Sequence, residues 1–158
     1  MYFDALSFLE DERDAWRPFE ALLDIPDAQF DTPVEDAHGW SGRELLSHLV
    51  AYQEHCLAVA RELALGERSP SHDAMEAAWA ERADAVNDEL SAAWRALPVD
   101  EVRRRARDVP GELRGYLTVV PETRWVKHPV FGRHFEEELL DHYVDHVDDL
   151  QAILRAAG

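Results

Sequence analysis

Cysteine is almost absent from the sequence, since Cys56 is the single thiol among 158 residues. An intramolecular disulfide or a multi-thiolate zinc site needs at least two thiols, so both are excluded. The sequence also lacks a run of about 18 apolar residues, the length that spans a membrane. It does not open on the cationic and then apolar run of a secretory signal. We therefore expect one cytoplasmic domain over residues 1–158, with no membrane partner.

Positive charge is scarce as well. The chain has 16 lysines and arginines against 33 aspartates and glutamates, which gives a net charge of −17 and a pI near 4.7. Proteins that bind nucleic acids take most of their affinity from cationic contacts to phosphates, and anionic membrane surfaces attract the same side chains. We therefore expect no nucleic-acid partner and no attachment to an anionic membrane surface.

Strand-forming patterns are nearly missing. Residues 117–120 are the only β-like run, and they are too few to build a sheet. Apolar side chains recur instead at three- and four-residue steps, which is the period of an amphipathic helix. This period predicts four long helical stretches, over residues 2–23, 41–65, 72–97 and 132–156. We predict an all-α protein whose helices form a four-helix bundle around one core.

The second stretch begins on residues that commonly cap a helix. Ser41 is followed three residues later by Glu44, and such a pair can bond exposed backbone N–H groups reciprocally in a capping box. Gly66 follows the stretch, and glycine commonly ends a helix. His48 then lies two turns inside the helix, at the margin of its apolar stripe.

The basic residues are concentrated in one segment. Residues 101–133 hold 8 of the 16 basic side chains and only four acidic ones, so the segment is +4 and the rest of the chain is −21. Its prolines and glycines predict a loop-rich connection before the last helix, with one short helix over residues 100–107. We expect Arg114, Arg124 and Lys127 either to bind the carboxylates of an anionic substrate or thiol cofactor, or to pair with the acidic helices.

Two histidines share one face of the last predicted helix. His142 and His146 are four residues apart, a spacing that lets two imidazoles reach one metal ion. A third ligand from His48 would complete a three-histidine site with a coordination position open to water, as in catalytic metal sites. Glu138 and Asp149 lie near the same face, and either could orient a ring nitrogen. The alternative is that the pair are surface histidines at a spacing that arises by chance.

Other candidate residues have more ordinary interpretations. We expect Cys56 to be a buried small side chain and His55 to be a pocket-lining or surface histidine. His134 lies two turns before His142 on the same face and could guard the mouth of a pocket, but at a helix start we expect it to be solvated. Trp125 lies in the basic segment and could line a substrate entrance, whereas the tryptophans at positions 16, 79 and 94 are expected in the core.

Two motifs resemble those of the DinB/YfiT-like superfamily. The first leads from a Gly-Trp-Ser entry to a histidine followed by leucine, over Gly39 to Leu49, and the second is the His-x-x-x-His pair of the last helix. The resemblance implies a four-helix bundle in up-down-down-up order, a homodimer, and a divalent metal, zinc or nickel, held by His48, His142 and His146. Related branches are metal-dependent hydrolases, bacillithiol transferases and mycothiol-dependent maleylpyruvate isomerase.

The resemblance leaves two classes of function open. The first is a metal-dependent enzyme that transfers a low-molecular-weight thiol or hydrolyses a small-molecule substrate. The second is a non-catalytic, stress-response bundle that binds metal and turns nothing over. The residues alone also allow a third hypothesis, a purely structural helical domain in which the histidines are incidental. The pair is not the His-Glu-x-x-His of a metalloprotease, because Tyr143 occupies the place of the catalytic glutamate.

Overall fold

The computed structural model describes all residues, 1–158, and every regular element in it is helical. The four longest elements are α1 (Ala5–Trp16), α3 (Gly42–Leu65), α4 (Pro70–Arg95) and α5 (Val99–Val119). Short turns of helix join α1 to α3, namely η1 (Arg17–Asp24), α2 (Asp27–Phe30) and η2 (Glu35–Ala37), and η3 (Glu122–Arg124) follows α5. None of the helices combines the length and the apolarity that crossing a membrane requires.

The last part of the chain is a C-terminal helical segment built from four consecutive elements. They are α6 (Pro129–Phe135), the π-helix η4 (Glu136–Asp141), α7 (His142–Asp145) and α8 (Val147–Ala157). The sequence predicts one regular helix here. The structure differs in two places, because η4 has the wider i→i+5 hydrogen bonding of a π-helix and the backbone at His146 leaves helical geometry, with φ −110° and ψ 6°.

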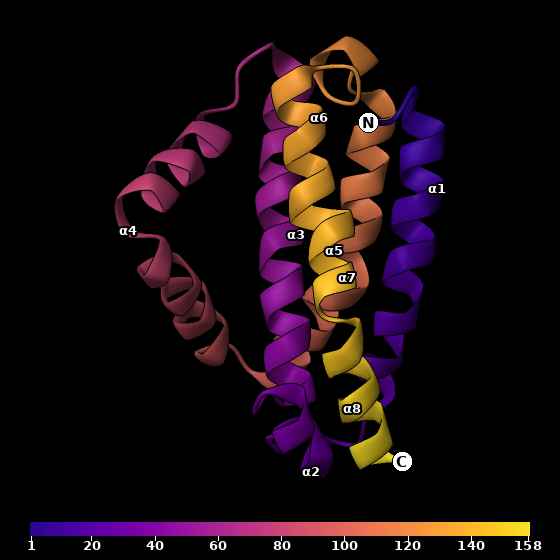
Figure 1. Cartoon of the computed structure of the whole chain (residues 1–158), viewed down its shortest axis with the longest axis vertical. Coiled ribbons are helices and arrows are strands. Elements are labelled where there is room, and N and C mark those ends of the chain that lie inside the picture. The colour runs from indigo at the N-terminus through magenta and orange to yellow at the C-terminus, as the bar shows by residue number, and fades with distance from the viewer.

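The long elements lie side by side around one core, except for α4. In Figure 1 α1 descends from the N-terminus, α3 and α5 ascend, and the C-terminal helical segment descends along them to the C-terminus. The core contains 33 buried residues drawn from all of these elements. α4 bows away from α3 between its two ends (Figure 1), and its backbone is kinked at Arg82, with φ −152° and ψ 51°.

α3 has the boundaries that its capping residues predict. The Ser41 hydroxyl accepts a hydrogen bond from the backbone N–H of Glu44 at 3.1 Å, and Gly66 follows the last helical residue. The helix is also the central element of the core, since it packs against both α4 and α5. This central position explains why more than half of its residues are buried.

α5 corrects the expected loop-rich connection. Residues 99–119 are one helix, even though Pro110 and Gly111 lie inside it. Proline inside a helix removes a backbone hydrogen bond and costs about 3 kcal/mol, but the helix buries a continuous apolar stripe that offsets this cost. The stripe repeats at three- and four-residue steps and consists of Val102, Ala106, Val109, Leu113 and Leu117.

Candidate metal centre

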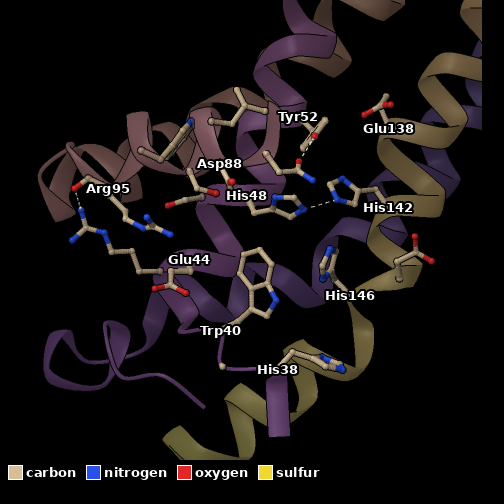
Figure 2. A pocket seen from close by; sticks show the side chains of 18 of the residues that line it. His38, Trp40, Glu44, His48, Tyr52, Asp88, Arg95, Glu138, His142 and His146 are labelled. Carbon is tan, nitrogen blue, oxygen red and sulfur yellow. Dashed lines mark hydrogen bonds between the residues drawn. The ribbon is translucent and has the colours of Figure 1, made fainter. Parts of the chain in front are cut away.

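Three imidazoles from two elements meet at the side of α3 that faces the C-terminal helical segment. His48 lies on α3, whereas His142 and His146 lie at the two ends of α7. The Nε2 atoms of His48 and His142 are 2.8 Å apart, as the dashed line in Figure 2 shows. One donor atom from each of the three rings can be chosen so that all three lie within 4.8 Å of one another. The structure therefore brings together the three histidines that the sequence selects.

The donor set fits a divalent cation such as zinc. Two nitrogens bound tetrahedrally to one zinc at 2.0–2.1 Å lie about 3.3 Å apart, roughly half an ångström more than the observed separation of His48 and His142. A small rotation of either ring supplies that difference. Nδ1 of His142 is buried and has no hydrogen-bond partner, so the polar contact of this ring is the one that its Nε2 makes with His48.

A buried carboxylate orients the third histidine. Oδ2 of Asp149 lies 2.9 Å from Nδ1 of His146, and Oδ1 of Asp149 lies 2.7 Å from Nδ1 of His38. Asp149 is only 5% exposed, although it is charged. A carboxylate that accepts the Nδ1–H of His146 leaves the lone pair on Nε2, which is the arrangement that orients histidine ligands in metal sites.

Burial keeps the rings of His48 and His142 neutral. Burial and the neighbouring imidazoles of His142 and His146 lower the pKa of His48 to about 3. Burial and the neighbouring His146 lower the pKa of His142 to about 4. Both rings are therefore neutral at pH 7, and the neutral imidazole is the form that binds a metal.

Two aromatic rings enclose the imidazoles. The ring of Trp40 lies 5.0 Å from that of His48 and 5.7 Å from that of His146, and the ring of Tyr52 lies 4.8 Å from that of His142. Trp40 follows two residues in left-handed backbone conformation, His38 at φ 55° and Gly39 at φ 81°. That turn sends Trp40 back against the start of α3, below His48 in Figure 2.

A pocket of about 890 Å³ opens beside the three histidines. Residues 79–95 of α4 form the wall opposite the histidines, with Trp79, Asn87 and Trp94 among the lining side chains. Trp79 therefore lines the pocket and is only partly buried, which corrects its expected place in the core. Six carboxylates and two arginines line the pocket, namely Asp31, Glu44, Asp88, Glu137, Glu138, Asp145, Arg43 and Arg95. The pocket is thus strongly acidic apart from its histidines.

The three basic residues expected to bind an anion do not line this pocket. Arg114 donates to the buried carboxylate of Glu12 at 2.9 Å, and Arg124 donates to the backbone carbonyl of Leu63 at 3.1 Å. Lys127 pairs with Glu122 at 2.8 Å. The expectation assumed a loop folded over the metal, whereas Arg114 lies in α5 and its side chain points into the bundle.

Trp125 is also placed differently from the expectation. Its side chain is fully buried in the core, against the rings of Phe8 and Phe135, so it lines no entrance. Cys56 is fully buried as expected, and burial raises the pKa of its thiol.

Sequence reasoning missed a second group of histidines, formed by His55, His72 and His134. Nε2 of His55 lies 2.9 Å from Nε2 of His134, and the rings of His72 and His134 are 4.6 Å apart. His134 is 4% exposed, so the expectation of a solvated residue is wrong. Two sequence signals could have suggested a second group, namely the seven-residue spacing of His48 and His55, about two α-helical turns, and the four-residue spacing of His72 and Glu76.

Comparison with known proteins identifies one family. The family described as "Mycothiol maleylpyruvate isomerase N-terminal domain" has a sequence model that matches residues 9–146. No curated protein and no solved structure gives a significant match to the chain. The matched range contains all three histidines of the candidate metal centre.

Proposed function

The chain belongs to the mycothiol maleylpyruvate isomerase N-terminal domain family, which is DinB-like, and from this membership we propose that it is a divalent-metal-dependent enzyme that transfers a low-molecular-weight thiol to a small electrophile. The observation that carries the proposal is the convergence of His48, His142 and His146 at the wall of the pocket. We further propose that α1, α3, α5 and the C-terminal helical segment form the four-helix bundle in up-down-down-up order that the resemblance implies.

Three protein ligands suit a catalytic metal better than a structural one. Structural zinc sites are closed by four protein ligands, whereas catalytic sites keep one position for water or substrate. A zinc or nickel ion held by three imidazoles would lower the pKa of a bound thiol, so that the thiolate nucleophile exists at neutral pH.

The surrounding side chains have separate roles in this proposal. Asp149 orients His146, and the rings of Trp40 and Tyr52 exclude water from the flanks of the imidazoles. The hydroxyl of Tyr52 donates to the side-chain carbonyl of Asn87, which joins the metal face of α3 to the α4 wall of the pocket.

The charge of the pocket restricts the electrophile. Six carboxyl groups against two arginines leave the pocket net negative, even with a divalent cation at the histidines and with the pKa of Glu138 raised to about 7, so the pocket repels a substrate that carries several negative charges. We therefore propose a neutral or cationic electrophile and a thiol without net negative charge. Mycothiol comes to this proposal from the name of the family alone.

Thiol binding to zinc-loaded protein tests the proposal. Mycothiol, bacillithiol, coenzyme A and glutathione are titrated calorimetrically into wild type and into His48→Gln, each with one equivalent of zinc. The expected result is metal-dependent binding of one thiol to wild type, with at least a tenfold loss in His48→Gln. His128→Asn is the matched control, because asparagine keeps a helix-capping side chain while one imidazole is removed outside the pocket.

The outcomes separate the candidate functions. Thiol binding followed by turnover of a neutral electrophile supports the transferase. Metal-dependent hydrolysis of esters, amides or lactones without thiol binding indicates the hydrolase instead. Bound metal with neither activity indicates the non-catalytic stress-response protein. A wild type that binds no more zinc than His48→Gln refutes the metal centre itself.

A further inference from the structure

The second histidine group combines three elements that are distant in sequence. His55 lies on α3, His72 lies in the first turn of α4 and His134 lies on α6. The carboxylate of Glu76, one turn after His72, lies 3.9 Å from Nδ1 of His134. One donor atom from each of His72, Glu76 and His134 can be chosen so that all three lie within 4.8 Å of one another. The group therefore has the compactness of a metal site.

The hydrogen bonds around the group leave lone pairs free where a cation would need them. Nε2 of His134 faces Nε2 of His55 at 2.9 Å, so a proton donated from His134 to His55 leaves the lone pair of His134 on Nδ1. Nδ1 is the atom that faces Glu76. In the same way, Oδ1 of Asp73 lies 3.3 Å from Nδ1 of His72, which leaves the lone pair of His72 on Nε2. Neighbouring groups orient histidine ligands in this way in metal sites.

Burial and charge also suit a cation. His72 and His134 are only 7% and 4% exposed, whereas the side chain of Glu76 is 62% exposed and leaves a path from solvent. Burial and the neighbouring imidazoles lower the pKa of His134 to about 3, and burial and His72 lower that of His55 to about 4. The rings of His134 and His55 are thus neutral at pH 7, and Glu76 supplies a negative charge among the three ligands.

We propose that His72, Glu76 and His134 form a second divalent-cation site, with His55 and Asp73 as the groups that orient the two ligand rings. Two imidazoles and one carboxylate are a donor set that zinc accepts, with one position left for water. The site lies outside the pocket and shares no residue with the candidate metal centre. It does not depend on the proposed thiol chemistry.

A cation in this site would fasten α4 to the bundle. His72 and Glu76 belong to the first turns of α4, and His134 belongs to α6. Residues 79–95 of the same helix form the wall of the pocket opposite the histidines of the candidate metal centre. The three ligands leave a position open to water, as in catalytic sites, but the site lies outside the pocket. The proposed role is therefore to hold in place a helix that otherwise bows away from α3 (Figure 1).

Zinc titration in a background without the first site tests the proposal. Calorimetry on the full chain carrying His48→Gln and His142→Gln is expected to show one bound zinc per chain, and none after His134→Gln is added. Adding His128→Asn instead is expected to leave one zinc bound. A background variant that binds no zinc overturns the proposal, as does a His134→Gln addition that leaves the bound zinc unchanged.

Two milder substitutions test the same site in case the His134 variant does not fold. Glu76→Gln changes an exposed side chain and is expected to weaken zinc binding at least tenfold, and His55→Gln is expected to weaken it about 10- to 100-fold. Circular dichroism checks that helix content is retained. Zinc affinity that neither substitution alters overturns the assignment of ligands. Wild type with one zinc per chain, together with a background that still binds one, would instead refute the first site and retain the second.

Discussion

Acidification of the metal-free protein is expected to unfold it in an unusually narrow pH range. The fold buries four neutral histidines, because the pKa values of His48 and His134 are lowered to about 3 and those of His142 and His55 to about 4. In the unfolded chain each returns to an ordinary pKa near 6.5. The stability that these groups contribute is present above pH 6.5 and is lost as the pH falls toward 4, since the unfolded chain takes up their protons first.

Carboxyls with a raised pKa work in the opposite direction; these are Glu54 and Glu138, and the shift of Glu138 is the large one. Burial and the nearby Glu137 and Glu76 raise the pKa of Glu138 to about 7. Near pH 5 the folded chain therefore keeps a proton on Glu138 that the unfolded chain has largely lost. Four histidines take up a proton on unfolding and Glu138 releases one, so unfolding takes up about three protons in total. The free energy of unfolding therefore falls by about 4 kcal/mol per pH unit between pH 6 and 5. Domains of this size are stable by about 5–15 kcal/mol in total.

The measurement is urea unfolding of chelator-treated protein at several pH values from 7 to 5, with the free energy extrapolated to zero urea. The double variant His48→Gln, His142→Gln removes two of the titrating groups, and its slope is expected to fall to about 1.4 kcal/mol per pH unit. A wild-type slope already that small, or a slope that the double variant leaves unchanged, would show that these histidines are not buried and neutral as the structure has them.

Three further substitutions test the buried hydrogen bonds of Glu12 in the core and the orientation of His146 at the candidate metal centre. Arg114→Met leaves the buried carboxylate of Glu12 without its ion pair and should cost about 3–5 kcal/mol in urea unfolding, with zinc stoichiometry unchanged; a cost below about 1 kcal/mol would contradict a buried pair. Tyr143→Phe removes a hydroxyl that bonds Glu12 and Gln53 at 2.8 Å each, and a loss of about 1–3 kcal/mol is expected in the same assay. Asp149→Asn should weaken zinc binding in calorimetry about 10- to 100-fold, and an unaltered affinity would rule out the orienting role.

The sequence predicts the convergence of His48, His142 and His146 because the evidence for it is local. The capping residues place the start of α3 at Gly42, so the face on which His48 lies follows from helical periodicity. His142 and His146 are one helical turn apart, and that spacing needs no knowledge of the rest of the fold. The resemblance drawn from these same residues is confirmed by the family match over residues 9–146.

What the sequence does not reveal depends on contacts between distant elements or on irregular backbone. Proline and glycine in residues 101–133 suggest a loop, and only the apolar stripe of α5 buried in the core outweighs them. Trp79 belongs to α4, which is kinked at Arg82 and bows away from α3, so its exposure could not be derived from periodicity. The second histidine group unites α3, α4 and α6, and no local pattern links His55, His72 and His134.

The π-helix η4 keeps two rows of histidines in register, one formed by His48 and His55 and the other by His134 and His142. On α3 the row advances seven residues, from His48 to His55, which is about two turns of an α-helix. On the facing segment the row advances eight, from His134 to His142, which in an α-helix overshoots two turns by about 80°. Because the wider turns of η4 absorb the extra residue, the two rows stay in step and each histidine of one meets a histidine of the other. A homologue one residue shorter in this stretch could keep its His-x-x-x-His motif intact and still lose the pairing of His134 with His55.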